Sequence, residues 1–485
     1  MRANLVAAIA FAAFSALFTM SQASAVALNP RGLGQVLIYP YYTVNKGQDT
    51  LLSIANAGNT GKIVSVRFFE SYNARSVLGF EVFLSPHDVW TAAITQTTDD
   101  NVAQIRTADT SCTVPTVTTA GMPFMTSNYA QAQQDSGPQT AQRTREGYIQ
   151  VIAVADTIPG SDLDQTITHV QNGTPGGGVP VCDPNVLRRS TPTAVPTSTL
   201  FGSVAIVNVG QGTFFGYTPD ALTGFTDISL NDAGTEPMLD DANTANAAPL
   251  TRASIVAGGQ ATDIDYQFPI DAVSAVFMAD SIYNEYFVDT SFGASTDWVV
   301  TLPTRGFYTD PALTQTPVPP FSVLFQNGRS DTIVTGKLYD REEGLIGDID
   351  ACTLCPPVAP VPSFPYAVNV IAFGNGGTSG VFGSNVVPFF IPLSGATTGN
   401  VALNFLDNGQ VQRLTEGTDS NGHSVTLYGL PVTGFMAYNV INTNAQPGLL
   451  ANYSGVFANR AGVTCRSAGL SASPACPAVI TSPPP

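Results

Sequence analysis

Val64-Ser65-Val66-Arg67-Phe68 alternates apolar and polar residues, which is the two-residue period of a half-buried β-strand. The segments Leu52-Ser53-Ile54 and Phe80-Glu81-Val82-Phe83-Leu84 follow much the same pattern. Turn-forming clusters separate these segments: Asn45-Lys46-Gly47-Gln48-Asp49, Asn56-Ala57-Gly58-Asn59-Thr60-Gly61 and Ser71-Tyr72-Asn73. Short strands joined by Gly/Asn turns are typical of an antiparallel sandwich. This part of the chain therefore predicts a β-fold.

Strand-like segments continue to the end of the chain, with long loops between them. They resume at Tyr148–Val154 and Ser203–Val209. The recurrence of Gly and Pro argues against long helices. We therefore expect an all-β fold of two antiparallel immunoglobulin-like β-sandwiches with long loops. The strands expected in the second sandwich are Val273–Met278, Trp298–Leu302, Phe321–Phe325, Val368–Phe373, Val401–Phe405, Val425–Leu427 and Met436–Val440.

The organisation of the chain follows from composition shifts along it. An acidic, Ala/Asn-rich stretch over residues 227–250 marks a linker or excursion. It divides a first sandwich with inserted loops, residues 26–226, from a second sandwich, residues 251–463. A Cys/Pro-rich tail follows over residues 464–485, and a signal peptide precedes over residues 1–25.

The signal peptide is read from the first 25 residues. Arg2 precedes Leu5–Met20, an apolar run without a charge, and Ala23-Ser24-Ala25 has the small-x-small form of a cleavage site. The apolar run is too short for a membrane span. We therefore expect an exported protein, located in the extracellular space, at the cell surface or in the periplasm, with no membrane insertion after signal cleavage.

Composition narrows the class of partner. The chain has 36 acidic and 19 basic residues, for a net charge of −17. Such a surface repels phosphate backbones, so we expect no nucleic-acid partner. Charged residues make up only 11% of the chain, while apolar residues make up 44%. This balance suits a large core under an unusually neutral surface.

Six cysteines in an exported chain indicate up to three disulfides. Proximity in the sequence favours Cys352–Cys355 and Cys465–Cys476, which leaves Cys112–Cys182. Fifteen pairings of six cysteines exist, so connectivity stays open. A redox role for Cys352 and Cys355 is disfavoured because prolines, and no helix, follow them.

Catalytic motifs are absent from the sequence. His87, His169 and His423 lie far apart, and no local motif supports a Ser–His–Asp triad. Exposed aromatic residues on a sandwich face could hold sugars, and the candidates for binding are Tyr39, Tyr41, Tyr42 and Trp90. The alternative is that these residues belong to the core and to ordinary strand surface.

Carboxylates gather at Asp340, Glu342, Glu343, Asp348 and Asp350. Oxygen ligands of this kind suit Ca²⁺, although the order of an EF-hand loop is missing. The same group could serve a glycan-acting enzyme, or could simply form a solvated loop. No cofactor is expected otherwise.

Several segments resemble a group of uncharacterised exported proteins of Gram-negative bacteria. The resemblance implies a shared β-rich fold and export, and it brings no activity or catalytic residue with it. The segments that carry it are Gln35–Val44, Val66–Arg75, Phe83–Trp90, Ser295–Thr304, Pro431–Phe435 and Leu449–Tyr453.

These observations favour a non-enzymatic surface or extracellular protein in adhesion, matrix or surface assembly, with other surface proteins as partners. Open strand edges of sandwiches offer such partners a place to pair. The alternative is a carbohydrate-binding or glycan-acting protein that uses the acidic loops and exposed tyrosines. The sequence leaves open the ligand and the oligomeric state.

Overall fold

The fold was analysed in a computed structural model, which is mostly β, with 46% strand and 10% helix. The structure describes residues 24–468 with internal gaps at 99–100, 172–173, 176–177, 189–191, 232–235, 245–248, 351–361, 375–377, 406–411, 443–445, 447–448 and 450. Residues 1–23 of the predicted signal peptide lie outside the described residues, and only Ser24 and Ala25 are described. The all-β class is confirmed, whereas the immunoglobulin-like type and the count of two sandwiches stay predictions.

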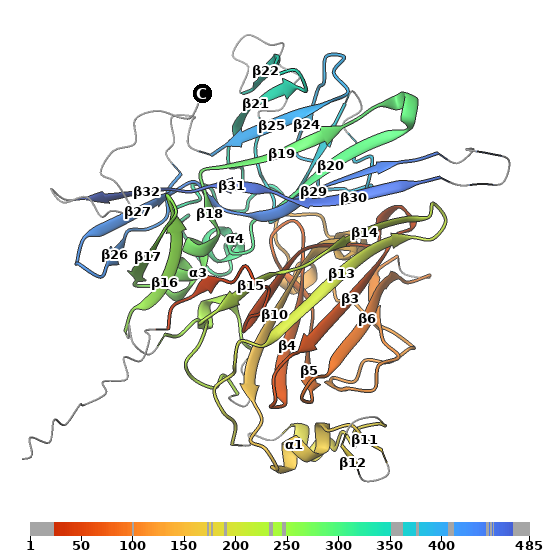
Figure 1. Ribbon diagram of the computed structural model, residues 1–485, viewed down its shortest axis with the longest axis vertical. Coiled ribbons are helices and arrows are strands. Elements are labelled where there is room, and N and C mark those ends of the chain that lie inside the picture. Colours follow the sequence, from red (N-terminus) through yellow and green to blue (C-terminus); the bar gives the residue numbers. More distant parts are fainter. Residues whose placement is uncertain are drawn as a thin grey trace, which may run out of the picture.

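Two large sheets form the first half of the molecule, in the lower part of Figure 1. The seven-stranded sheet has the order β1 (Ala27–Leu28), β15 (Asp220–Thr223), β2 (Val36–Thr43), β10 (Glu146–Asp156), β4 (Lys62–Glu70), β5 (Ser76–Leu84) and β8 (Cys112–Val114). The six-stranded sheet has the order β14 (Thr213–Tyr217), β13 (Leu200–Asn208), β3 (Asp49–Asn56), β6 (Val89–Gln96), β7 (Ala103–Arg106) and β9 (Met122–Pro123).

Three five-stranded sheets form the second half. The β20 sheet has the order β24 (Phe390–Ile391), β23 (Val368–Phe373), β20 (Ala294–Thr301), β29 (Thr433–Val440) and β30 (Tyr453–Ala458). The β25 sheet has the order β22 (Leu345–Ile349), β21 (Thr335–Asp340), β25 (Thr398–Asn404), β19 (Ser281–Phe287) and β31 (Arg460–Gly462). The β17 sheet has the order β16 (Thr251–Ala257), β17 (Gln260–Tyr266), β26 (Gly417–Asp419), β27 (Ser424–Tyr428) and β32 (Thr464–Ala468).

Short elements complete the described fold. The small pairs are β11 (Val170–Gln171) with β12 (Thr174–Pro175) and β18 (Met278–Ala279) with β28 (Leu430–Pro431). The α-helices are α1 (Asp162–Ile167), α2 (Pro184–Leu187), α3 (Pro269–Phe277) and α4 (Arg305–Thr309). The 3₁₀ turns are η1 (Asn45–Gly47), η2 (Gln131–Gln133), η3 (Ala141–Arg145), η4 (Leu239–Asp241) and η6 (Thr290–Phe292).

The middle strands of the seven-stranded sheet, β2, β10 and β4, are buried on both faces. On one face Leu37 and Tyr39 share a core with Leu52 and Ile54 of the six-stranded sheet. On the other face Val36 and Ile38 join a second core that also contains Trp298. Because residues on a strand alternate between faces, β2 links the cores of the two halves. The halves therefore pack as one stack of sheets rather than meeting only through a connector.

This arrangement corrects the expected half-burial of Val64–Phe68. Ser65 and Arg67, on the polar face of β4, are only 6% and 7% exposed. The Arg67 guanidinium forms an ion pair with Glu236, which partly compensates for its burial. An alternating pattern shows that the two faces differ, but it does not show that the polar face meets water.

Two expected strands are wrong. Val273–Met278 is mostly helix, because it lies in α3, where Pro269 occupies an early helical position and residues 271–277 are buried. A short apolar run does not distinguish a buried helix from a buried strand. Phe321–Phe325 is irregular backbone, anchored by the packing of Phe321 on Tyr308, with ring centroids 5.8 Å apart.

The stretch 227–250, expected as a linker or excursion, contributes to the core where it is described. Leu239 and Ala242 are buried in the second core cluster. Within the expected tail, β32 pairs with β27 through Cys465 opposite Leu427. In the part of the chain that the structure describes, no helix is long and apolar enough to cross a membrane.

Candidate functional site

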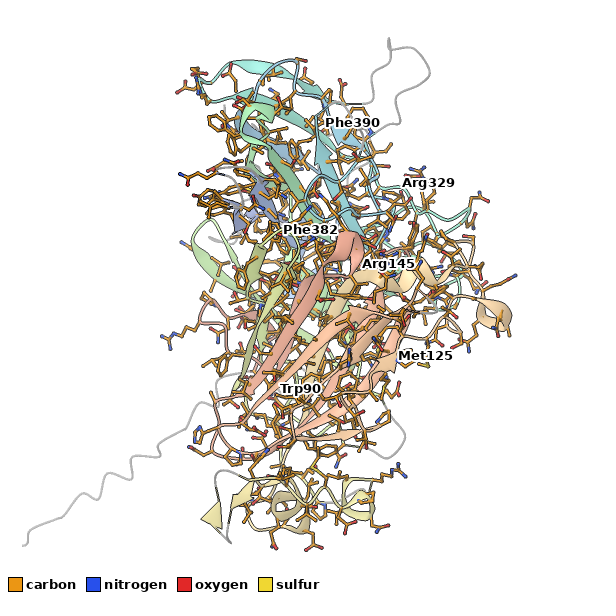
Figure 2. The ribbon with its side chains drawn as sticks, turned by 90° about the vertical axis from the view of Figure 1, so that its right-hand side faces the viewer. Trp90, Met125, Arg145, Arg329, Phe382 and Phe390 are labelled. Carbon is orange, nitrogen blue, oxygen red and sulfur yellow. A yellow bond between two sulfur atoms is a disulfide. The ribbon has the colours of Figure 1, made fainter. Side chains whose placement is uncertain are left out.

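The aromatic residues expected to bind a ligand lie in the core. Tyr39, Tyr41, Tyr42 and Trp90 are all 0% exposed. The hydroxyl of Tyr41 donates to Glu146 at 2.9 Å, and burial raises the pKa of Tyr41 well above its usual value. Trp90 packs on Phe80 with ring centroids 5.5 Å apart, and Figure 2 shows it among the strands of the first half. This corrects the expectation of exposed binding aromatics, because all four side chains belong to the core cluster that the seven-stranded and six-stranded sheets share.

The five carboxylates expected to bind Ca²⁺ are spread along the β21–β22 hairpin. The Asp340 carboxylate accepts hydrogen bonds from the backbone of its own turn, at Glu342 and Gly344. Glu342 pairs instead with Arg341 at 2.6 Å. Glu343, Asp348 and Asp350 are exposed. Among the described residues, no group of three His, Cys, Asp or Glu side chains could hold a metal ion, so the expected set does not converge.

One of the expected disulfides is confirmed. Cys112 is bonded to Cys182, with the two Cα atoms 5.4 Å apart. Cys465 is also disulfide-bonded. Its expected partner Cys476 lies outside the described residues, as do Cys352 and Cys355. The Cys112–Cys182 bond ties β8 at the edge of the seven-stranded sheet to the segment before α2.

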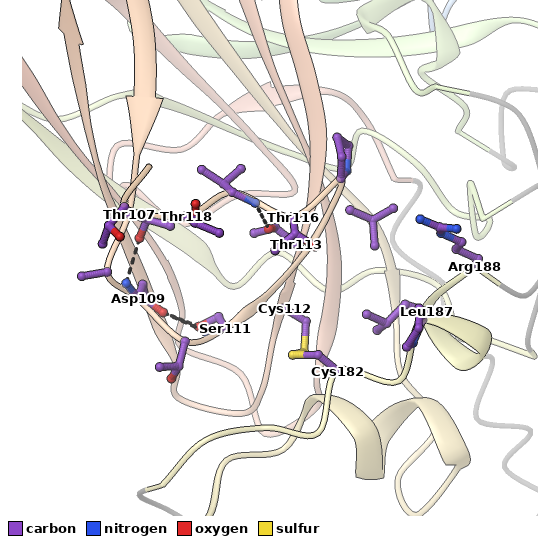
Figure 3. A pocket seen from close by; sticks show the side chains of 17 residues that line it. Thr107, Asp109, Ser111, Cys112, Thr113, Thr116, Thr118, Cys182, Leu187 and Arg188 are labelled. Atoms are coloured by element: carbon purple, nitrogen blue, oxygen red, sulfur yellow. Dashed lines mark hydrogen bonds between the residues drawn. A yellow bond between two sulfur atoms is a disulfide. The ribbon is translucent and has the colours of Figure 1, made fainter. Parts of the chain in front are cut away.

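A shallow pocket lies beside this disulfide (Figure 3). It has a volume of about 360 Å³, and residues 107–119 form most of its wall. Asp109 and Arg188 are its charged lining residues, and no aromatic side chain lines it. The Asp109 carboxylate accepts from the Ser111 hydroxyl at 2.7 Å. The hydroxyl-bearing lining residues are Thr107, Thr110, Ser111, Thr113, Thr116, Thr118 and Thr119.

A cluster of Ser, Asp and His side chains lies next to the pocket. The sequence did not predict this cluster. His169 follows α1 and reaches the turn between β5 and β6. Its Nδ1 is 3.2 Å from the Ser85 hydroxyl and 3.7 Å from the Asp88 carboxylate. Its Nε2 is 3.3 Å from the Thr110 hydroxyl. The sequence hinted at this cluster only through Ser85 and Asp88, which lie in one turn.

The geometry of this cluster differs from a Ser–His–Asp triad. In a triad, the hydroxyl and the carboxylate contact opposite nitrogens of the imidazole. Here Ser85 and Asp88 contact the same nitrogen, and the hydroxyl at the opposite nitrogen belongs to Thr110. The backbone N–H of Ser111, next to Thr110, already donates to Asp109 rather than pointing at a reacting oxygen. The cluster instead holds the α1 segment against the sheet edge.

His87 lies in the same turn as Ser85 and Asp88, but its Nε2 is 3.0 Å from the side-chain oxygen of Asn59, in the turn between β3 and β4. The His423 ring is 3.2 Å from Asp419, within its own turn. The histidines therefore do not converge on a shared site.

The outer face of the six-stranded sheet carries a different kind of surface. Four large apolar side chains project from it while the opposite face of the sheet packs into the core. Their exposed fractions are 43% for Leu51, 46% for Val89, 42% for Phe201 and 60% for Phe214. We call these four residues, together with the groove that Leu51 lines on the same sheet, the apolar face.

The groove of the apolar face has a volume of about 410 Å³ and a floor of small residues. Ser53 lies opposite Thr91 on one side and Ser203 on the other. Leu51 lies opposite Ala93 and Ala205. Arg106 is the one charged residue among those that line the groove. Two carboxylates accompany Arg106 on this face. Asp49 lies two residues before Leu51 on β3, and Asp109 accepts from the Thr91 N–H at 3.1 Å.

Comparisons with protein-family models, with curated protein sequences and with solved structures found no match for this chain. The resemblance to exported proteins of Gram-negative bacteria stays a prediction from the motifs quoted above.

Proposed function

We propose that this chain is an exported, non-enzymatic protein of the cell surface or extracellular space, which acts in surface assembly by contact with other proteins. The signal-like first 25 residues support export, and so does the Cys112–Cys182 disulfide, because disulfides persist in oxidising compartments. An immunoglobulin-like sandwich in the first half is part of this proposal. The core shared by the seven-stranded and six-stranded sheets supports it.

The observation that carries the proposal is the apolar face. Isolated apolar residues are ordinary on protein surfaces, but a contiguous apolar patch with a polar rim marks a contact surface. Leu51, Phe201 and Phe214 lie on three neighbouring strands of one sheet, and their side chains share its outer face. Apolar side chains spread over one sheet face in this way suit the surface of another protein better than a small molecule.

The partner we propose is a second copy of this chain. The net charge of −17 makes two copies repel each other over most approaches. Arg106 lines the groove of the apolar face, with Asp49 and Asp109 beside it, so the face carries little net charge and the repulsion between two acidic copies is weak there. Two apolar faces brought together would also remove Leu51 and Phe214 from water.

Charge placed on the apolar face tests this proposal. We expect the mature protein to sediment as a dimer at micromolar concentration. The double variant Leu51→Glu and Phe214→Glu should sediment as a monomer, because association would bury two carboxylates without partners. The measurement is analytical ultracentrifugation, with circular dichroism to confirm an unchanged fold.

The matched control is Val256→Glu on β16. Val256 is 65% exposed, on an edge strand of the β17 sheet in the other half. This variant adds one carboxylate, half the charge of the double variant, at an exposed apolar position away from the apolar face, and should leave the dimer intact. A wild-type protein that stays monomeric at all accessible concentrations would refute self-assembly.

Glycan binding is the second candidate function, and the pocket beside the disulfide favours it. Its lining of threonine and serine hydroxyls can exchange hydrogen bonds with sugar hydroxyls. It lacks the aromatic side chain on which sugar rings commonly stack, which places this function second. A glycan array with the mature protein tests it. Selective binding that is lost in Thr116→Val would favour this function over surface assembly.

A further inference from the structure

Val26, the residue after the expected cleavage site, is part of the core. It is 0% exposed and belongs to the core cluster that contains Leu222 and Phe225. Its N–H donates to the Arg252 carbonyl at 2.8 Å, and its carbonyl accepts from the Ser254 N–H at 2.8 Å. Both hydrogen-bonding groups of its backbone are therefore engaged with β16.

The residues on either side of Val26 are also held. Ala27 and Leu28 form β1, which pairs with Thr223 and Leu222 of β15. Ala25 lies against Gly224, which has a φ of +62°. A Cβ atom at Gly224 would lie only 2.1 Å from the Ala25 carbonyl oxygen. The backbone around the Ala25–Val26 bond thus lies between the ends of β15 and β16.

A protease needs several residues around the scissile bond in an accessible backbone, and buried, hydrogen-bonded segments resist cleavage. We infer that the native fold closes the Ala25–Val26 processing site, so that cleavage must precede the docking of Val26. This inference rests on the export proposed above. Hydrolysis adds water across the C–N bond, leaving a carboxylate on Ala25 and an ammonium group on Val26.

The order of the two events has a structural consequence. Once the leader is removed, Val26 and β1 can join β15 and β16 and close the contact between the two halves. If the precursor folds first, the bond is reachable only through local opening, and the cleavage rate follows the open fraction. A folded precursor is therefore a slow substrate.

The test compares the full-length precursor in two states. Purified precursor is either refolded completely or diluted from denaturant directly into a bacterial signal peptidase, and the product is identified by mass and N-terminal sequencing. We expect cleavage after Ala25 to be about a hundredfold slower for the folded precursor. Equal rates for the two states would overturn the inference.

A spacer variant is the control for the peptidase. It repeats Ala-Ser-Ala at the end of a flexible Gly/Ser segment inserted between Ala25 and Val26. The repeat then occupies the enclosed position before Val26, and the original site at Ala25 is moved outside the fold. It should be cleaved rapidly at the outer site in both states. If neither this variant nor the unfolded precursor is cleaved, the export proposal itself fails, which is a different outcome from equal rates.

Gly224→Ala provides an independent variant. The three nearest atoms to its new Cβ all belong to Ala25 and Ser24, which cleavage removes. The clash therefore exists in the precursor and is absent from the mature chain, where only the strain of a left-handed alanine remains. The folded Gly224→Ala precursor should be cleaved faster than the folded wild-type precursor. A slower rate would contradict the enclosure of this bond.

Discussion

Arg143 is a buried cation that two carboxylates hold in the core. Its side chain is 0% exposed, and it contacts Glu70 at 2.6 Å and Asp135 at 2.6 Å. The guanidinium also lies over the Tyr129 ring, 4.4 Å from its centroid. Glu70 in turn accepts backbone hydrogen bonds from the turn at Asn73. The network thereby fixes the turn between β4 and β5.

Removing this cation should destabilise the protein strongly. Arg143→Met leaves Glu70 and Asp135 buried without a counter-ion, and breaking a buried pair in this way costs about 3–5 kcal/mol. Chemical denaturation of the mature protein measures the loss. Arg341→Ala, which breaks the exposed pair with Glu342, is the control and should leave the stability nearly unchanged. Similar losses for both variants would contradict this account of Arg143.

The burial and the contacts of single residues were the least predictable features of the structure. Tyr39, Tyr41 and Tyr42 come in one short segment, and the identity of a tyrosine does not reveal whether its ring meets water. Their burial depends on the layers that cover both faces of β2, which come from residues up to several hundred positions away. The contact of His169 with Ser85 and Asp88 has the same origin in long-range packing.

At the scale of elements, the Cys112–Cys182 disulfide joins β8 to the α1–α2 segment, across a sequence separation of 70 residues. A small separate core underlies this segment and contains Phe83, Leu163 and Ile167. The segment therefore has few apolar contacts of its own, and the covalent bond restrains it.

The double variant Cys112→Ser and Cys182→Ser should loosen this segment first. Loss of a disulfide of this span costs about 2–5 kcal/mol. Hydrogen–deuterium exchange should rise in residues 107–119 and 162–187, while β10 stays protected. Uniformly faster exchange over the whole chain would show instead that the bond supports the fold globally.

Elements were predicted well where their pattern was unambiguous. The strands around Leu52–Ile54, Val64–Phe68 and Tyr148–Val154 lie in β3, β4 and β10. Helix α3 was missed because Val273–Met278 is a short apolar run, and such a run fits a buried strand as well as a buried helix. The Cys112–Cys182 pairing could be predicted because proximity favoured pairing the other four cysteines among themselves.

At the scale of the whole molecule, the junction between the halves buries acidic groups. Glu146 accepts hydrogen bonds from Tyr41 and from Ser384 of the second half. Asp297 accepts from backbone N–H groups of residues 380–382. Burial raises the pKa of Glu146 and of Asp297 above their usual values of 4.5 and 3.8, although these hydrogen bonds partly oppose the shift.

These shifts predict greater stability in mild acid. A carboxyl group whose pKa is raised in the folded state binds its proton more tightly there than in the unfolded chain. Its contribution to the free energy of unfolding is complete below the pKa that the group has in the unfolded chain. This contribution is lost as the pH rises through the pKa that the group has in the folded protein. Asp220 and Asp271 shift in the same direction through burial. The free energy of unfolding should therefore fall as the pH rises from about 4 towards neutrality.

Denaturation at a series of pH values measures this slope, and Glu146→Gln is the informative variant. It removes one titrating group from the junction, so its slope should be shallower than that of the wild type. The pKa of Asp135 is lowered by Arg143 despite burial, and this group works in the opposite direction. Stability that rises steadily from pH 4 to 7 would contradict the prediction.

The whole-molecule arrangement was only partly predictable. Composition and periodicity predicted the all-β class because they depend on local patterns. The second covered face of the seven-stranded sheet depends on how the two halves meet, and no local pattern records it. The apolar face was missed for the opposite reason, since Leu51, Phe201 and Phe214 lie on separate segments and form a patch only after β3, β13 and β14 pair.

The most direct test of contact through the apolar face is to cross-link a cysteine introduced at its centre. Ser203 is exposed on the groove floor, and its hydroxyl lies 2.9 Å from that of Ser53. With a short thiol-to-thiol cross-linker, Ser203→Cys should yield a covalent dimer of mature chains at micromolar concentration. Val256→Cys, exposed on the β17 sheet, should stay monomeric. Equal cross-linking of the two variants, or none in Ser203→Cys, would contradict assembly through the apolar face.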